Sequence, residues 1–251
     1  MSAAPLLEIA GVTVRFGVNR ALSEVDLQVP AGEVAGLIGP NGAGKTTLFN
    51  VVTGQQKASS GRVLLDGRDI GRLDTHHRAR LGIGRTFQRL ELFGDLTVAD
   101  NLRVAGEIRN RWRLFGLGGG HLDVSARVEH VLDTLGLTPL ADVSAADVPT
   151  GTARLVELGR ALMAQPRLLL LDEPASGQTE SETEDFGRLL RRLADDEGTT
   201  VLLVEHDMGL VMEVCDQVHV LDFGAVIAHG TPDEVQQDAR VLDAYLGAPG
   251  A

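Results

Sequence analysis

The sequence predicts an α/β fold whose core is a mainly parallel sheet. Three short stretches are continuously apolar: Val34 to Ile38, Leu168 to Leu171 and Val201 to Val204. Such runs are typical of parallel strands that helices cover on both faces. At or just after their ends lie Gly39, Asp172 and His206. Because ligands of open parallel sheets bind beyond the carboxyl ends of the strands, we expect these three ends to form one site.

Other segments alternate between polar and apolar residues instead of being continuously apolar. The alternation runs through Leu7 to Val14, Val25 to Val29 and Arg62 to Asp66. This pattern is typical of strands with one solvated face. It predicts a small antiparallel layer beside the parallel sheet.

The middle of the chain, between about residues 88 and 155, lacks strand patterns and has helical ones instead. Thr97 and Asp100 form a helix start, Val128 to Leu135 carries apolar residues at helical spacing, and Gly136 is a stop signal. We therefore expect a helical insertion that interrupts the core.

The core is expected to resume with a helix that contains Leu155, Leu158 and Leu162. Near the end of the chain, Thr231-Pro-Asp-Glu places a capping residue, a first-turn proline and a third-position carboxylate in order. This order predicts a final helix that runs to about Leu246.

A loop between the first apolar run and the helix-like segment Leu48 to Thr53 has the composition of a phosphate-binding loop. Its residues are Gly39, Pro40, Asn41, Gly42, Ala43, Gly44, Lys45, Thr46 and Thr47. The glycines allow a tight turn that points backbone N–H groups inward, beside the positive end of the next helix. Lys45 can reach the β- and γ-phosphates of ATP, and the Thr46 hydroxyl can ligate Mg²⁺. The alternative is a flexible glycine turn before an ordinary helix, and the flanking strand and helix patterns favour nucleotide binding.

Two strand ends supply candidate catalytic groups. Asp172 and Glu173 directly follow a buried strand, where an acidic pair also suits the first turn of a helix. Beside a phosphate loop, Asp172 can hold Mg²⁺ and Glu173 can polarise an attacking water. His206 can hydrogen-bond the γ-phosphate and that water, or else be a surface or capping residue. Gln88, at the start of the helical insertion, can sense Mg²⁺ or the γ-phosphate.

Composition excludes several function classes. The chain has 251 residues, 43% of them hydrophobic, and a net charge of −12 that disfavours nonspecific binding to nucleic acid or to an anionic membrane. No segment is long and apolar enough to span a bilayer, and Met1 to Ala10 lacks the pattern of a signal peptide. We expect a cytoplasmic protein without nucleic-acid partners, whose single cysteine, Cys215, is buried and inert.

The motifs and their order resemble the ATP-binding subunits of the ABC transporter family, and the resemblance extends over nearly the whole chain. It implies a P-loop NTPase (RecA-like) fold that uses ATP and Mg²⁺. Gly39 to Thr47 is then the Walker A loop and Gln88 the Q-loop glutamine. Asp172 becomes the Walker B aspartate, which holds the metal with Thr46 and Gln88. Glu173 is identified as the catalytic base and His206 as the switch histidine.

The resemblance also implies an adenine contact and a domain plan. Phe16 falls where the family places an aromatic ring against adenine; the alternative is a core residue at a strand end. Residues 1–251 then form a single nucleotide-binding domain. The core and β layer take about residues 1–87 and 155–230, the helical subdomain about 88–154, and a C-terminal helix 231–251.

The chain departs from the family pattern at two places. The signature, usually Leu-Ser-Gly-Gly-Gln, falls at Val148 to Thr152, where only Gly151 is retained. In the family this element binds the γ-phosphate held by the opposite subunit, and here the Thr150 and Thr152 hydroxyls and the Gly151 N–H remain as donors. Gln178 and Thr179 replace the end of the loop after Walker B, which implies weaker coupling or slower hydrolysis.

Several stretches are similar to the branched-chain amino-acid importer ATPases, among them Arg85 to Val98, Val204 to Met208 and Val241 to Gly247. We therefore expect an ATPase at the inner face of the cell membrane that works with permease subunits and a second ATPase chain, identical or related, head to tail. Basic residues in and next to the insertion of Gly106 to Asp123 either contact lipid or the permease or form a solvated face; they are Arg103, Arg109, Arg111 and Arg113, with Trp112. A lipopolysaccharide-exporting ATPase, a soluble non-transport ABC ATPase and a P-loop kinase are the alternatives.

Overall fold

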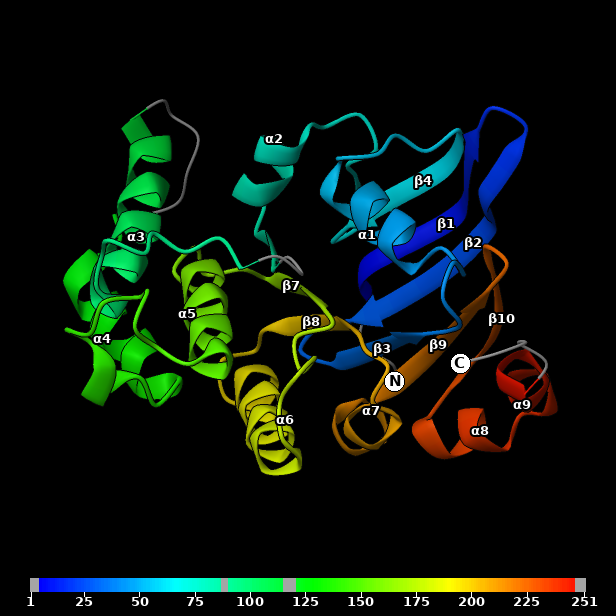
Figure 1. Cartoon of the computed structure of the whole chain (residues 1–251). Helices are drawn as coiled ribbons and strands as arrows, with labels where there is room; N and C mark the ends of the chain where they lie inside the picture. The colour runs from blue at the N-terminus through cyan, green and yellow to red at the C-terminus, as the bar shows by residue number, and fades with distance from the viewer. Residues whose placement is uncertain (1–4, 87–89, 115–120, 247–251) are drawn as a thin grey trace.

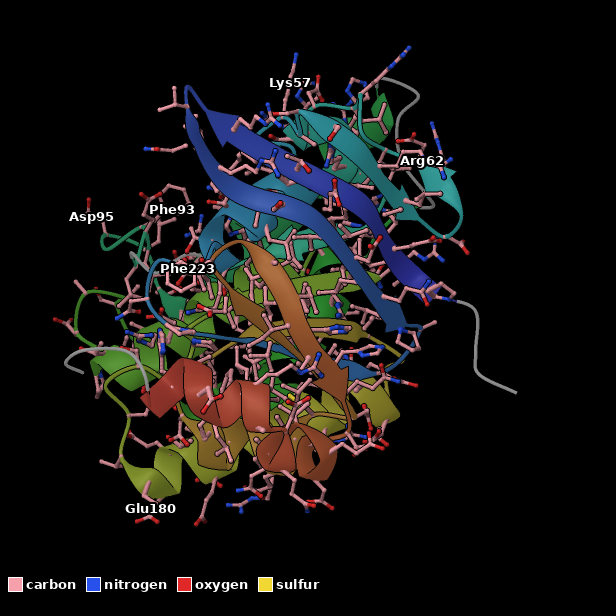
Figure 2. All side chains as sticks on the ribbon, turned by 90° about the vertical axis from the view of Figure 1, so that its right-hand side faces the viewer. Lys57, Arg62, Phe93, Asp95, Glu180 and Phe223 are labelled. Carbon is pink, nitrogen blue, oxygen red and sulfur yellow. The ribbon has the colours of Figure 1, made fainter. Side chains whose placement is uncertain are left out.

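A computed structural model describes residues 5–86, 90–114 and 121–246 of the chain. One of its sheets is antiparallel, with strand order β2-β1-β4-β5. Its strands are β1 (Pro5–Phe16), β2 (Asn19–Pro30), β4 (Ser60–Leu65) and β5 (Arg68–Asp69). Figure 2 shows this sheet as an outer layer, with Lys57 and Arg62 at its upper edge. The antiparallel layer predicted from alternating residues is confirmed.

The second sheet has six strands in the order β10-β9-β3-β8-β7-β6. They are β3 (Val34–Ile38), β6 (Ile83–Arg85), β7 (Leu168–Asp172), β8 (Thr200–Val204), β9 (Gln217–Asp222) and β10 (Ala225–Gly230). All neighbouring pairs are parallel except β9 with β10. Since β8 lies between β3 and β7 and all three strands are parallel, the three apolar runs end side by side at the carboxyl ends of the strands.

The two faces of this sheet belong to two hydrophobic clusters. On β7, Leu168 and Leu170 pack toward the antiparallel layer, whereas Leu169 and Leu171 pack toward the helices. The helix α1 (Lys45–Thr53) lies between the two sheets and buries Leu48 and Phe49. On the other face lie α6 (Glu180–Asp195) and α7 (Met208–Val214) (Figure 1). Period-two alternation on a strand covered on both sides explains the continuous apolar runs.

Helices form the part of the structure at the left of Figure 1. They are α3 (Val98–Leu114), α4 (Val124–Thr134), the short 3₁₀ turn Thr138–Leu140 and α5 (Thr150–Leu162). A further short helix, α2 (Thr75–Arg80), precedes β6. Asp123 caps α4 by accepting a hydrogen bond from the Ala126 N–H. The predicted helix starts and the helix of Leu155 to Leu162 are present, while the boundaries of a helical subdomain stay a prediction.

The single C-terminal helix predicted for residues 231 onward is wrong. The chain forms α8 (Pro232–Gln237) and α9 (Ala239–Leu246), with Asp238 extended between them. The capping box of Thr231 and Glu234 begins α8 as expected. The break arises because the Asp238 carboxylate accepts a hydrogen bond from the Arg240 N–H at 2.8 Å, which starts a new helix.

Cys215 is buried in the helix-covered cluster, and its burial raises the pKa of the thiol to about 12. A thiol with so high a pKa is protonated and unreactive at neutral pH. Among the described residues, no helix combines the length and apolar character needed to cross a membrane.

Candidate nucleotide-binding site

The loop after β3 takes a conformation that only glycine adopts without strain. Gly39, Gly42 and Gly44 all have positive φ angles, of 148°, 82° and 110°. A Cβ atom on Gly39 would lie 1.9 Å from the Leu221 carbonyl oxygen on β9. The backbone at Gly39 therefore packs directly against β9, and this contact fixes the position of the start of the loop. The loop leads into the N-terminus of α1, whose first N–H groups face an anion favourably.

Lys45 folds back over this loop. Its ammonium donates hydrogen bonds to the Gly39 carbonyl at 2.5 Å and to the Pro40 carbonyl at 3.1 Å. Burial lowers the pKa of Lys45, and the negative charges of Glu173 and Asp172 oppose that shift. Lys45 therefore lies within electrostatic range of both carboxylates, beside the phosphate loop.

Asp172 ends β7 and is only 4% exposed. The guanidinium of Arg85, at the end of β6, donates to Asp172 Oδ2 at 3.0 Å. Burial raises the pKa of Asp172, while the hydrogen bond from Arg85 lowers it. Among the described residues, no partner reaches Asp172 Oδ1, which is buried. A buried acceptor without a partner beside a phosphate loop fits a ligand position for a hydrated divalent cation.

Glu173 and His206 meet at the tips of β7 and β8. His206 Nε2 lies 2.9 Å from Glu173 Oε1, and both side chains are partly exposed to solvent. Glu173 has a φ angle of 52°, which is uncommon for a residue with a side chain. Such backbone strain is often found at functional sites, where the surrounding structure maintains it.

Two further charged residues, Arg85 and Glu205, belong to this site and were not predicted from the motifs. Arg85 also donates to the Asn50 side chain at 2.7 Å, so it ties α1 to the tip of β7. Glu205 is 4% exposed and accepts hydrogen bonds from the N–H groups of Ala175 at 2.8 Å and His206 at 3.0 Å. Glu205 could have been predicted, because it directly follows the buried strand β8, as Asp172 and Glu173 lie at the end of β7. Arg85 gave no local signal, because its partner is distant in sequence.

A family model described as "ABC transporter" matches residues 22–176, from before the phosphate loop to just beyond Glu173. The chain belongs to the ABC transporter family. A second model, described as "Branched-chain amino acid ATP-binding cassette transporter", matches residues 225–251. The resemblance drawn from the motifs is therefore confirmed at the level of the family.

Several curated ATP-binding proteins are similar to this chain over nearly its whole length. It is 39% identical to the high-affinity branched-chain amino acid transport ATP-binding protein BraF of Pseudomonas aeruginosa, over 97% of this chain and 98% of BraF. It is 38% identical to LivG of Escherichia coli, which carries the same description, over 97% of this chain and 98% of LivG. The lipopolysaccharide export system ATP-binding protein LptB of Escherichia coli is 37% identical, over 91% of this chain and 92% of LptB.

Solved structures of ABC cassettes have the same fold. MJ1267, an ATP-binding cassette of an ABC transporter, superimposes with a TM-score of 0.86 at 32% identity, over 97% of this chain and 99% of that one. The protein cbiO1 of Clostridium perfringens, part of the transporter complex cbiONQ, gives a TM-score of 0.81 at 27% identity, over 97% and 94% of the two chains. The predicted P-loop NTPase fold is confirmed.

Predicted signature residues line a different hollow from the phosphate loop. Thr150, Gly151 and Thr152 form the first turn of α5. Gly151 and Thr152 line a hollow with residues of α6 such as Glu182, and the lining of this hollow includes no residue of the loop 39–47. The partly exposed N-terminus of a long helix leaves free N–H donors for an anion.

Of the two residues that depart from the family pattern after Glu173, Thr179 has a structural role. Thr179 is the N-cap of α6: its hydroxyl accepts from the Glu182 N–H, and the Glu182 carboxylate accepts from the Thr179 N–H. This capping box begins α6 directly after the loop that follows Glu173.

Phe16 ends β1 and is 53% exposed, so its ring is available for stacking, and its adenine contact stays a prediction. Gln88 lies outside the described residues. Of the basic residues for which the sequence left lipid or permease contact and a solvated face as alternatives, Arg103 pairs with Asp100 and Arg109 donates to Gln165 at 2.7 Å. The side chains of Trp112 and Arg113 lie outside the described part.

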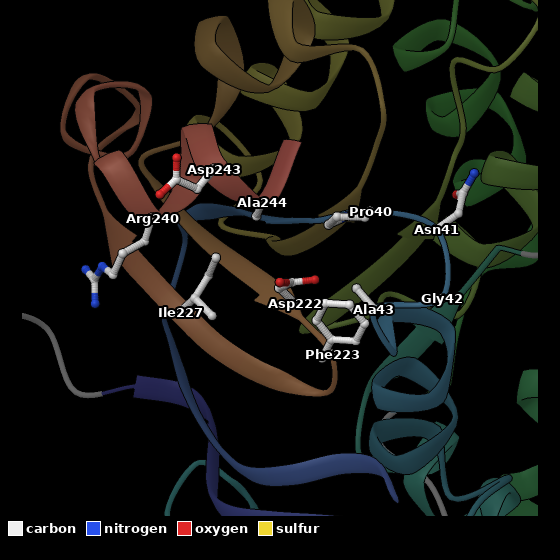
Figure 3. Close-up of a pocket in the computed structure, with 10 residues that line it drawn as sticks. All are labelled: Pro40, Asn41, Gly42, Ala43, Asp222, Phe223, Ile227, Arg240, Asp243 and Ala244. Carbon is white, nitrogen blue, oxygen red and sulfur yellow. The ribbon is translucent and has the colours of Figure 1, made fainter. Parts of the chain in front are cut away.

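A hollow of about 600 Å³ lies beside the phosphate loop (Figure 3). Pro40 to Ala43 form one wall, and the turn between β9 and β10 and helix α9 form the other. Phe223 projects from that turn and is 90% exposed (Figure 2). Lys45, Asp172 and Glu173 are not among the residues that line this hollow.

Proposed function

We propose that this ABC chain binds and hydrolyses ATP to power a transporter that imports branched-chain or other hydrophobic amino acids. The convergence of Lys45, Asp172, Glu173 and His206 at one edge of the six-stranded sheet carries the ATPase part of the proposal. Phosphoryl transfer to water requires a cation for the phosphates, a metal-binding carboxylate and a base. Lys45, Asp172 and Glu173 supply these groups, and the His206 imidazole lies next to the base.

The loop of Gly39 to Thr47 cradles the phosphates of ATP, and Phe16 stacks on the adenine. In this mechanism the Lys45 ammonium leaves the Gly39 and Pro40 carbonyls and turns to the β- and γ-phosphates. Glu173 orients and deprotonates the attacking water. His206 Nε2, which lies 2.9 Å from Glu173 Oε1, holds the Glu173 carboxylate in place beside the γ-phosphate.

Mg²⁺ fits this site, because Asp172 offers a buried oxygen without a partner among the described residues and Thr46 offers an exposed hydroxyl. When bound, the ion neutralises negative charge on the β- and γ-phosphates. Asp172, Thr46 and Gln88 would hold it, directly or through water.

A second ATPase chain completes each site. The first turn of α5, Thr150 to Thr152, is exposed enough to receive the γ-phosphate held by the opposite chain. Two chains then bind two nucleotides head to tail, with either an identical or a related partner. The chain acts at the inner face of the cell membrane, on permease subunits, and has no nucleic-acid partner.

Import of branched-chain amino acids is preferred over lipopolysaccharide export because the family model of residues 225–251 bears the branched-chain description. The identity to BraF and LivG also extends over a larger share of the chain than the identity to LptB. Lipopolysaccharide export is the second candidate.

Phosphate release by the wild-type chain and by Glu173→Gln tests the ATPase part. We expect the variant to bind ATP with unchanged affinity and to release phosphate at least about 100-fold more slowly. Equal rates would refute Glu173 as the base. ATP-dependent association of Glu173→Gln chains, followed by light scattering, tests the shared site; Gly151→Asp should prevent it by placing a carboxylate against the γ-phosphate.

Transport is tested by co-purification from membranes and by uptake. We expect the chain to co-purify with polytopic permeases and its deletion to abolish uptake of labelled leucine. A chain that stays unpartnered and phosphorylates a metabolite would instead be a kinase. If deletion of the chain instead removed lipopolysaccharide from the cell surface and left leucine uptake normal, lipopolysaccharide export would be the function.

A further inference from the structure

The strained backbone at Glu173 is held by three other segments of the chain. The first of these is β8, because the Glu173 N–H donates to the Val204 carbonyl at 2.8 Å. A left-handed φ of 52° at a residue with a side chain persists only where neighbouring groups maintain it. The groups around this turn therefore determine where the Glu173 carboxylate points.

The second segment is the residue pair that follows β8. Glu205 is buried, and its carboxylate accepts hydrogen bonds from the Ala175 N–H at 2.8 Å and the His206 N–H at 3.0 Å. One buried side chain thus fixes both the loop after Glu173 and the backbone of His206. Hydrogen bonds to a buried carboxylate are costly to lose, because no water molecule can take the place of the lost N–H donor.

The third segment is α5. The guanidinium of Arg154 donates from Nη1 to the Glu173 carbonyl at 3.0 Å and to the Pro174 carbonyl at 3.3 Å. Arg154 is partly buried and lies one helical turn after Thr150, the first residue of α5. Through these two hydrogen bonds, Arg154 links α5 to the backbone of the Glu173 turn.

We propose that Arg154 is a positioning residue that couples the orientation of α5 to the orientation of the Glu173 carboxylate in the same chain. The proposal rests on the proposed function, in which Glu173 is the base and the N-terminus of α5 contacts the nucleotide of the opposite chain. Contact of α5 with one nucleotide then changes the position of the base that acts on the other. The two sites are coupled through a rigid helix and one guanidinium.

The coupling predicts a specific defect. Loss of the Arg154 hydrogen bonds leaves Lys45 and the phosphate loop intact, so ATP binding should be retained. A misplaced base slows the chemical step by about 10- to 100-fold, because small displacements of a catalytic group are costly. A purely structural defect would instead weaken binding and stability together.

Hydrogen exchange in the nucleotide-free chain gives a readout that does not depend on activity. In Arg154→Met we expect the Glu173 and Ala175 amides to exchange at least about tenfold faster, while the amides of residues 39–47 are unchanged. Arg154→Lys retains one donor and should give an intermediate rate. Arg127→Met is the matched control, because Arg127 donates to the Leu162 carbonyl at 3.1 Å and pairs with Glu197 far from Glu173.

Kinetics complete the test. We expect Arg154→Met to lower kcat at an unchanged KM for ATP, Arg154→Lys to restore part of the rate, and Arg127→Met to behave as wild type. Unchanged exchange at Glu173 and Ala175, or an equal effect of Arg127→Met, would overturn the proposal. Faster exchange together with a fully active Glu173→Gln would leave the Arg154 contact standing and refute the proposed role of Glu173.

Discussion

Arg85 Nη2 lies 3.0 Å from Asp172 Oδ2, and both side chains are almost completely buried. The pair joins the tips of the neighbouring strands β6 and β7, at the carboxylate proposed to hold the metal. A second arginine, Arg167, makes an equally short contact with Asp66 at 2.8 Å, but there both side chains are more than half exposed. The two pairs differ in burial, and Arg85 also donates to the side chains of Asn50 at 2.7 Å and Gln55 at 3.2 Å.

Arg85→Met should destabilise the protein by about 3 kcal/mol, because it leaves the Asp172 carboxylate buried without its cation. Arg167→Met should cost less than about 1 kcal/mol, since water replaces the lost partner of Asp66. Urea unfolding of the two variants measures the difference. Equal losses would mean that burial of the Arg85 pair contributes nothing.

His206→Ala should slow phosphate release by about 100-fold with little change in the KM for ATP, because the imidazole that holds Glu173 is lost. His130 offers a matched control. Its Nε2 lies 3.2 Å from Glu197 Oε1, and the exposure of this pair resembles that of His206 and Glu173. His130→Ala should therefore leave phosphate release unchanged, and a similar loss in both variants would contradict a specific role for His206.

Gly39→Ala should destabilise the protein by about 3 kcal/mol or more and abolish ATP binding, since its Cβ atom would overlap the Leu221 carbonyl. Gly17 also has a positive φ, of 61°, but nothing lies within 4 Å of its added Cβ. Gly17→Ala should cost only about 1 to 2 kcal/mol of backbone strain. Thermal unfolding and nucleotide titration of both variants check the contrast.

His219 should make stability depend on pH. Burial lowers its pKa from 6.5 to about 4, and its Nε2 lies 3.1 Å from the Gln28 carbonyl. The unfolded chain therefore binds a proton on His219 at a higher pH than the folded chain does. The stabilisation is fully present above pH 6.5 and falls as the pH drops toward 4, by about 3 kcal/mol in total.

Urea unfolding of His219→Gln between pH 7 and pH 4 tests this dependence. The variant should lose less stability than the wild type over that range. The comparison is His229→Gln, which alters an exposed histidine whose ring lies 5.9 Å from that of His219 and whose charge lowers the His219 pKa less than burial does. This variant should keep most of the wild-type pH dependence. A wild-type pH profile in His219→Gln would exclude His219 as the source.

Much of the fold could be predicted from local patterns. Val34–Ile38 is a strand with the predicted boundaries, because a short apolar run before a glycine turn has few alternatives. The antiparallel pair β9 and β10 was not predicted, and the helix expected after Thr231 is broken at Asp238. That break depends on a side-chain cap that competes with a continuous helix, and hydrophobic spacing does not reveal such competition.

The sequence by itself determined the chemistry that this chain can perform. The glycines of the loop 39–47, the Lys45 ammonium and the carboxylates after a buried strand are encoded in neighbouring residues, since turns and strand ends depend on local sequence. Only the tertiary structure decided how these groups are held. Arg85 reaches Asp172 across 87 positions, and Arg154 reaches Glu173 across 19, because strand order and helix packing bring distant residues together. Contacts of this kind arise from the packing of whole elements, which no local pattern specifies.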